Sequence, residues 1–437
     1  MENPTKPLPK VQALLLGLQH VLAMYAGSVL VPLLIGTALH FSATQLAYLI
    51  SVDIFCTGLA TLLQLKQTPV TGIALPVVLG SSIQAVSPLI NIGSTLGYGA
   101  MYGATIVAGL FVVVVAGSFS RLRGFFPPVV TGSLITVIGL SLTPIALQNW
   151  GGGTTTARSF GSYQNLMIGL ITIMITLILM KFAKGFLKAI SILLGIVLGT
   201  IFSAFFGAVS LKPVGNAAWF HLPTPFFLGM PTFSWSASLT MIVIVLTAMI
   251  EATGVYFALA EITGQNLSQK DLARGYRAEG LAAILSGIFN TFPYSTFSQN
   301  VAVIRLSGVK TKQPIYYAAC LLLVLGLLPK FGALATIIPS AVLGGAMMVM
   351  FSTIAIQGVQ ILGKVDLTKE GNLLTAGLSI GAGLSIGAVP TFLNQFPEAF
   401  KLILTNGVVV TTLLAVLLNL FLNGCPDNNQ KNKTNPQ

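Results

Sequence analysis

The residues that could bind a polar solute are concentrated in two short, proline-interrupted segments of a hydrophobic chain. The first is LPVVLGSSIQAVSPLI, Leu75 to Ile90, and the second is FPYSTFSQNVAVIRLSG, Phe292 to Gly308. Inside a membrane, hydrocarbon offers no hydrogen-bond partner to serine, threonine, asparagine or glutamine. These polar groups must therefore either bond to one another or line a site.

The two segments can be aligned with each other at an offset of 217 residues. Three pairs of positions then coincide, namely Pro76 with Pro293, Ser81 with Ser298, and Ser82 with Gln299. A proline break followed by a half-helix would turn free backbone N–H groups and the positive end of a helix dipole toward the bilayer centre. Paired broken segments mark the midplane site of many transporters, whereas the alternative is that proline and serine only kink packed helices.

Ionisable residues inside apolar segments are the second group that could do chemistry. Glu251, in TAMIEATG, could accept N–H donors from a solute or bind a proton, or it could pair only with a neighbouring helix. Glu279 is expected to open the next segment near the interface, where the helix dipole favours an acidic residue. Asp53 and His20 are lone polar residues on apolar helices, so they are expected to bond between helices. His20 could alternatively relay a proton.

The composition is that of a membrane protein. Of the 437 residues, 54% are hydrophobic and 7% are charged, whereas soluble domains carry about a quarter charged residues. Since a crossing takes about 20 apolar residues, the chain is expected to be an all-α polytopic membrane protein with about fourteen segments. The three cysteines lack metal-ligand spacing and no nucleophile–base pair is evident, so neither a metal, a cofactor nor an enzyme is expected.

The net charge of +12 is spread in short clusters between apolar segments, so nucleic acid is not an expected partner. Threading fourteen segments from a cytoplasmic N-terminus places 18 of the 22 Lys and Arg residues on the cytoplasmic side. The four external ones are Arg158, Lys212, Lys330 and Lys401. The positive-inside rule therefore predicts a multi-pass protein of the cytoplasmic membrane with both termini in the cytoplasm.

An external linker at residues 209–235 divides the chain near its midpoint. With an odd number of segments on each side, the second half must enter the membrane from the opposite face. Residues 1–208 and 236–424 are therefore expected to form two inverted repeats, followed by a cytoplasmic tail at 425–437. Short extended stretches are expected in the third and tenth segments.

The sequence resembles the nucleobase/ascorbate transporter family, and within it the bacterial xanthine permease type. The family signature of Gln or Glu, Asn, any residue, Gly, four residues and Thr corresponds to QNVAVIRLS. Gln299 and Asn300 are in place, while Ala302 and Ser307 replace the usual Gly and Thr. Further stretches, including LQHVLAMYAGSVLVPL and IEATGVYFALAEITG, extend the resemblance over nearly the full chain.

This resemblance implies a fold and a movement. It implies two inverted repeats of seven segments, sorted into a core of segments 1–4 and 8–11 and a gate of segments 5–7 and 12–14. It also implies a homodimer and an elevator-like displacement of the core against the gate.

The resemblance further implies roles for individual residues. Glu251 and Gln299 would hold the substrate, with Phe297 and Ser298 offering backbone amides and Ile83 standing at the position of an aromatic contact. Ser82, the counterpart of Gln299 in the alignment of the two segments, completes the expected binding residues. Glu279 would take part in proton coupling, with Asn300, His20 and Asp53 supporting the site.

The expected function is proton-coupled uptake of xanthine. A purine-dione presents N–H donors and C=O acceptors on one edge, which a carboxyl group and a glutamine amide can answer. Gln299 in place of Glu, and Val255 where uracil-type members have a histidine, favour an oxidised purine over uracil. Urate and uracil are the alternatives within the family, and an anion exchanger or a channel is the alternative outside it.

Overall fold

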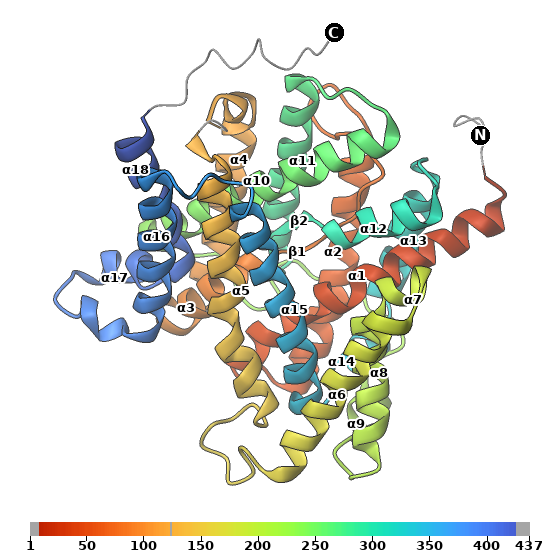
Figure 1. Cartoon of the computed structure of the whole chain (residues 1–437). Coiled ribbons are helices and arrows are strands. Elements are labelled where there is room, and N and C mark those ends of the chain that lie inside the picture. Colours follow the sequence, from red (N-terminus) through yellow and green to blue (C-terminus); the bar gives the residue numbers. More distant parts are fainter. Residues whose placement is uncertain (1–7, 123–124, 425–437) are drawn as a thin grey trace.

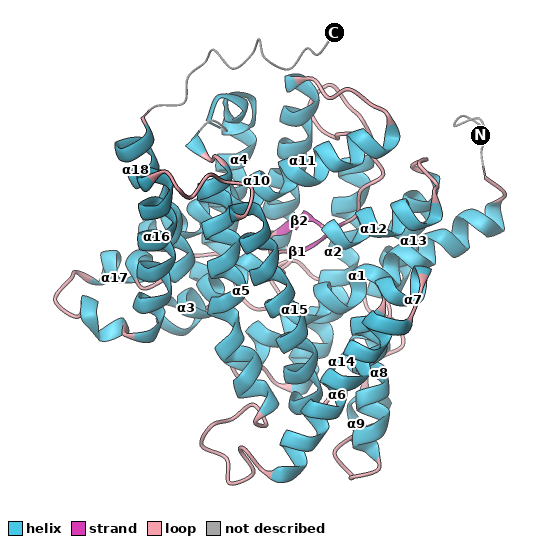
Figure 2. Cartoon of the chain, viewed as in Figure 1, coloured by secondary structure: helices cyan, strands magenta, loops and turns pink. Residues whose placement is uncertain are grey.

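The computed structural model describes residues 8–122 and 125–424, so the predicted tail at 425–437 lies outside the described residues. Helices make up almost all of the regular structure, and two short strands lie side by side in the middle of the molecule (Figures 1 and 2). The predicted helical, polytopic character and the extended stretches in both broken segments are confirmed.

The first half of the chain contains these elements: α1 (Lys10–Ala38), α2 (Ala43–Leu65), β1 (Leu79–Ser81), η1 (Ile83–Ala85), α3 (Val86–Leu96), α4 (Tyr98–Leu122), α5 (Pro128–Trp150), α6 (Tyr163–Phe182), α7 (Gly185–Ala189), α8 (Ser191–Ala204) and α9 (Lys212–Asn216). The second half contains α10 (Trp235–Thr263), α11 (Gln269–Ile288), β2 (Tyr294–Thr296), α12 (Ser298–Ser307), α13 (Gln313–Gly326), α14 (Pro329–Thr336), α15 (Ser340–Leu362), α16 (Glu370–Ala388), η3 (Pro390–Leu393), α17 (Glu398–Leu404) and α18 (Gly407–Asn423).

Eight helices in the described ranges are long and apolar enough to cross a membrane. They are α1, α2, α4, α5, α6, α10, α15 and α16. A ninth crossing is possible if α13 and α14, which meet at 81°, form one broken span. The other apolar segments are shorter, as in α8 and α18, or are divided between a strand and a half-helix. A chain that buries such interrupted segments needs side chains to satisfy the backbone where the helix is broken.

The helices pack mainly within two groups. In one group α4 lies against α11 and α10, while α2 and α1 lie against α13. In the other, α5 lies against α15, α6 against α8 and α15, and α16 against α18 (Figure 1). The sheet belongs to the first group, where β1 contacts α1 and α2 and β2 contacts α10 and α11.

Small residues bring the best-packed helix pairs into backbone contact. A Cβ atom on Gly109 of α4 would lie 2.7 Å from the carbonyl oxygen of Gly280 in α11, and one on Gly280 would lie 2.8 Å from that of Gly109. Between α5 and α15, a Cβ on Gly139 would lie 2.4 Å from the backbone nitrogen of Ala355. Such close approach gives membrane helices their packing energy, because lipid provides little hydrophobic drive between them.

Strands β1 and β2 form a two-stranded antiparallel sheet that joins the two broken segments. Leu79 pairs with Thr296, Gly80 with Ser295, and Ser81 with Tyr294. The pairing extends by one bond at each end, because Ser82 N–H donates to the Pro293 carbonyl (2.8 Å) and Phe297 N–H donates to the Val78 carbonyl (3.0 Å).

Side chains from the neighbouring helices cap the outer edge of β1. Leu79 N–H donates to the Thr61 hydroxyl of α2 at 3.1 Å, and Ser81 N–H donates to the Ser28 hydroxyl of α1 at 3.3 Å. An open sheet edge inside a membrane would leave these donors without partners. The short sheet is therefore possible only because α1 and α2 supply hydroxyl groups beside it.

The Phe297 ring is held between two glycines. A Cβ atom on Gly80 of β1 would lie 2.4 Å from one edge of the ring, and a Cβ on Gly27 of α1 would lie 2.8 Å from the other. Phe297 is buried. Its packing thus fixes the start of α12 against both α1 and β1.

We expect Gly80→Ala to lower the thermal stability of the detergent-solubilised protein, because the added methyl group collides with a ring that has no room to move. Overpacking of this kind costs about 1–3 kcal/mol. Gly377→Ala in α16 is the matched control, since nothing lies within 4 Å of the Cβ that it adds. Equal melting temperatures for the two variants would contradict the packing assigned to Phe297.

Candidate functional site

Each strand leads directly into a half-helix, and this sets the correspondence between the two segments. Ser82 and Phe297 are the N-cap residues that follow β1 and β2. Matching these caps gives an offset of 215 residues, so that Gln84 corresponds to Gln299. The predicted pairing of Ser82 with Gln299 at an offset of 217 is therefore wrong. It aligned the prolines, but the chain needs two residues more between proline and half-helix in the first segment.

The Glu251 carboxyl group of α10 is bonded to Gln84, which sequence reasoning missed. The Gln84 amide nitrogen donates to Glu251 Oε2, and Gln84 Oε1 accepts from the Thr247 hydroxyl at 2.7 Å. Thr247 and Glu251 are four residues apart on α10, so they lie on one face of the helix. The half-helix of the first broken segment is thus tied to α10 by a single glutamine.

Gln299 lies at the second residue of α12 and is partly exposed, as is Glu251. The neighbouring Ser298 is exposed, and its hydroxyl lies 3.5 Å from Gln299 Oε1. Ile83 is also partly exposed. The predicted binding residues therefore combine a partly exposed glutamine, a partly exposed glutamate and a modest apolar surface.

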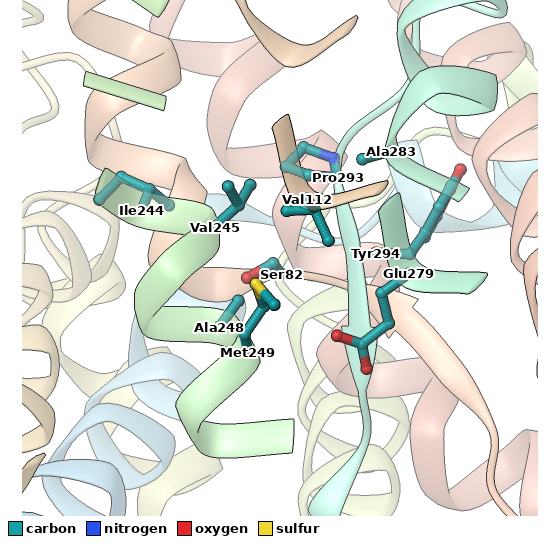
Figure 3. A pocket seen from close by; sticks show the side chains of 10 residues that line it. All are labelled: Ser82, Val112, Ile244, Val245, Ala248, Met249, Glu279, Ala283, Pro293 and Tyr294. Carbon is teal, nitrogen blue, oxygen red and sulfur yellow. The ribbon is translucent and has the colours of Figure 1, made fainter. Parts of the chain in front are cut away.

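Two other predicted contacts are less available to a solute. The Phe297 N–H group is engaged by Val78, so α12 offers its free backbone donors from Ser298 onward. Ser82 is buried, and within the described chain its hydroxyl has no hydrogen-bond partner. Ser82 lines an adjacent cavity (Figure 3).

That cavity is small, with a volume of about 20 Å³, and lies beside the sheet. Its walls come mainly from α10 and α11, and the polar groups among its lining residues are Ser82, Glu279 and Tyr294. Figure 3 shows the Glu279 carboxyl group close to the β2 segment, with Met249 and Ala248 of α10 across from it. A mainly apolar cavity therefore lies next to Ser82, two residues before Gln84.

Glu279 lies in the middle of α11 and is buried, with 5% of its surface exposed. The expectation that it opens a segment near the interface is wrong, because the polar stretch before it is helical. That helix begins after Ser268, where Ser268 and Asp271 form a capping box. The Glu279 carboxyl accepts from the Tyr256 hydroxyl at 2.7 Å and from the Thr296 hydroxyl at 3.2 Å. It therefore connects α10, α11 and β2.

Asp53 joins the two strands at one register position. Ser81 donates its hydroxyl proton to Asp53 Oδ2 at 2.6 Å, and the Tyr294 hydroxyl donates to Asp53 Oδ1 at 3.1 Å. Ser81 and Tyr294 are directly opposite each other in the sheet. Asp53, expected to bond between helices, instead links α2 to both strands of the sheet.

His20 and Asn300 connect α1 to α12. The Asn300 amide nitrogen lies 3.0 Å from His20 Nδ1 and donates to the His20 carbonyl at 3.4 Å. Both residues are buried. The hydrogen-bonding role expected for His20 is thus confirmed, and Asn300 braces the half-helix that carries Gln299.

Half-helices that begin at the two ends of a central sheet in a polytopic bundle, beside a partly exposed glutamate, are the arrangement of a secondary transporter. The model of a permease family matches residues 11–392. The chain is 47% identical to the uric acid permease PucK of Bacillus subtilis, with 97% of this chain and 98% of that protein covered. It is 46% identical to the xanthine permease of the same organism, with 94% of each covered.

The chain belongs to this permease family, the nucleobase/ascorbate transporters. Solved structures share its fold at lower identity. The transmembrane domain of the cyanobacterial bicarbonate transporter BicA matches with a TM-score of 0.58 at 18% identity, covering 95% of this chain and 98% of that one. The murine Slc26a9 anion transporter in the inward-facing state matches with a TM-score of 0.61 at 15% identity, covering 96% and 70%.

We expect Asp53→Ala to destabilise the protein more than Asp53→Asn does. Alanine leaves the buried Ser81 hydroxyl without its acceptor, which costs about 1–3 kcal/mol, and removes one bond of Tyr294, whose hydroxyl keeps the Thr291 hydroxyl at 2.8 Å. Asparagine keeps the size and one acceptor oxygen, so at least one of the two bonds can persist. Thermal unfolding in detergent measures the order, and an alanine variant as stable as the asparagine variant would show that Asp53 does not clamp the strands.

Proposed function

We propose that this protein takes up an oxidised purine, with xanthine as the first candidate, across the cytoplasmic membrane together with protons. The observation that carries the proposal is the site at the ends of the two half-helices, where Glu251 and Gln299 are both partly exposed. The carboxyl group can accept the N–H donors of a purine-dione, and the amide can answer both donors and acceptors. Relatives that are 46% and 47% identical are named xanthine and uric acid permeases.

The proposed topology has fourteen segments in two inverted repeats. It is supported by the order of strand, cap and half-helix, which recurs at an offset of 215 residues in a chain of 437. The broken segments and the short helices α8, α13 and α18 would supply crossings beyond the long helices. We further propose that residues 209–235 link the repeats outside the cell.

The proposed movement is a displacement of a core against a gate. The division of helix packing into two groups supports this assignment, with segments 1–4 and 8–11 as the core and segments 5–7 and 12–14 as the gate. Few elements connect the groups, chiefly α10 with α17 and α18, and α12 with α7. A sparse interface allows one packed body to slide past another, whereas tightly packed interiors resist such movement.

The proposed orientation places the Arg305 end of α12 at the cytoplasm. Exposed residues run from the site toward that end, namely Ala302 and Arg305 on α12 and Gly254 and Phe257 on α10. This orientation puts Arg305 on the cytoplasmic side, where the positive-inside rule places the excess of basic residues. We also propose that the protein is a homodimer, as the resemblance to the family implies.

Urate is the second candidate substrate, because the uric acid permease is as similar to this chain as the xanthine permease is. An anion exchanger is less favoured even though bicarbonate and anion transporters share the fold. An anion exchanger would be expected to place a basic group at the centre, where this chain has Glu251, and a shared fold does not imply a shared substrate.

We expect Glu251→Gln and Gln299→Ala each to reduce the initial rate of labelled xanthine uptake by about a hundredfold or more, because each removes a hydrogen bond to a desolvated substrate. Uptake is measured in cells that lack their own purine permeases, with membrane levels checked by immunoblot. Glu261→Gln, at an exposed position ten residues further along α10, is the matched control. Wild-type rates in either site variant would overturn the assignment of the site.

We expect uptake to depend on the proton gradient. Dissipating the gradient with a protonophore should prevent the purine from accumulating inside the cell above its external concentration, because the proton gradient is the proposed driving force. Replacing sodium with choline should leave uptake unchanged. Accumulation that survives the protonophore but requires sodium would show that the coupling ion was wrongly assigned.

A further inference from the structure

The Gln84 side chain stands where a ligand of Glu251 would be expected. Its amide nitrogen donates to the Glu251 carboxyl and its amide oxygen accepts from the Thr247 hydroxyl at 2.7 Å. The carboxyl group fixes the orientation of the amide, because only the NH₂ end can donate to it. Two residues on one face of α10 therefore bond to both the donor and the acceptor of the Gln84 amide.

A primary amide and a purine lactam present the same edge. Each carries an N–H donor beside a C=O acceptor in one plane, so each can bond to a carboxyl group and a hydroxyl group together. Thr247 and Glu251 lie about 6 Å apart along the helix axis, as residues four apart do. The two α10 groups that hold Gln84 are therefore also suited to hold an oxidised purine.

We propose that the Gln84 amide is an internal stand-in for the substrate, which occupies Glu251 and Thr247 in the empty transporter and is displaced when a purine binds. The inference rests on the proposed function. It adds Gln84 as a residue that controls both the affinity for the purine and the rate at which the empty carrier returns. Thr247 becomes part of the binding site for the same reason.

The physical basis is the cost of leaving a carboxyl group without a partner away from water. A carrier that works by moving its core must return with the site empty, and at that stage the purine no longer satisfies Glu251. Gln84 reaches Glu251 from the first broken segment, and both belong to the helix group proposed as the core. The bond can therefore persist throughout the return movement.

The same bond weakens substrate binding. A purine must compete with an amide that is already in place, so the observed affinity is lower than the intrinsic affinity by the fraction of carriers in which Gln84 has moved aside. Gln84 is 7% exposed, whereas the Glu251 residue as a whole is partly exposed, so a substrate can approach this pair from the Glu251 side more readily than from the Gln84 side.

Gln299 provides a built-in comparison. It has the same position in its half-helix as Gln84, but within the described residues its amide oxygen lies 3.5 Å from the Ser298 hydroxyl and its amide is not bonded to a carboxyl group. One glutamine of the pair is engaged in the empty protein and the other is open to a solute. Removal of the two side chains should therefore have opposite effects on binding.

The test compares net uptake with exchange in proteoliposomes. Net uptake into empty vesicles requires the empty carrier to return, whereas exchange against unlabelled xanthine inside does not. For Gln84→Ala we expect the ratio of net uptake to exchange to fall about tenfold and the dissociation constant of xanthine to fall about threefold or more. For Gln299→Ala we expect both rates to fall together and the dissociation constant to rise.

Gln84→Asn is the second variant, in case alanine impairs folding. Asparagine is one methylene shorter and cannot span Glu251 and Thr247, so it should shift the ratio in the same direction as alanine. Weaker xanthine binding with a parallel fall in both rates would show that Gln84 is an ordinary substrate ligand, and an unchanged ratio would show that it has no role in the return. A wild-type protein that neither exchanges nor takes up xanthine or urate would instead overturn the proposed function itself.

Discussion

The need to satisfy backbone hydrogen bonds where two segments stop being helical governs the centre of this protein. In hydrocarbon an unpaired N–H or C=O group is costly, so a broken segment survives only if something else bonds to it. Here the two breaks satisfy each other as strands β1 and β2, and hydroxyl groups of Thr61 and Ser28 cap the remaining donors of β1. Asp53 then fixes the register by bonding to Ser81 and Tyr294, which face each other across the sheet.

This solution places the functional groups. Because each strand ends at a fixed register position, each half-helix starts at a fixed place, and the second helical residue of each is a glutamine. Gln84 faces α10 and bonds to Glu251, while Gln299 is left accessible. The same sheet therefore solves a structural problem and sets where the two half-helices that carry these glutamines begin.

Around the site, buried polar groups form chains rather than isolated contacts. Gln64 of α2 donates to the Tyr256 hydroxyl at 2.6 Å, and Tyr256 in turn donates to Glu279, which also accepts from Thr296 of the sheet. His20 and Asn300 make a similar connection between α1 and α12. Networks of this kind rigidify the helices that carry the proposed binding residues, since a lost bond would leave a buried partner unsatisfied.

The sequence alone determined the membrane class, the two broken segments and the chemical types at the site, because hydropathy, proline breaks and rare ionisable residues are local properties of the chain. It also singled out Gln299 and Asn300 through the family signature, and Glu251 as a rare ionisable residue in an apolar segment. Only the tertiary structure decided that Gln84 corresponds to Gln299, that Glu279 lies within a helix, and that Asp53 clamps the strands. Those facts depend on strand register and on contacts between residues that are far apart in the chain, such as Gln84 and Glu251, and packing sets both of them.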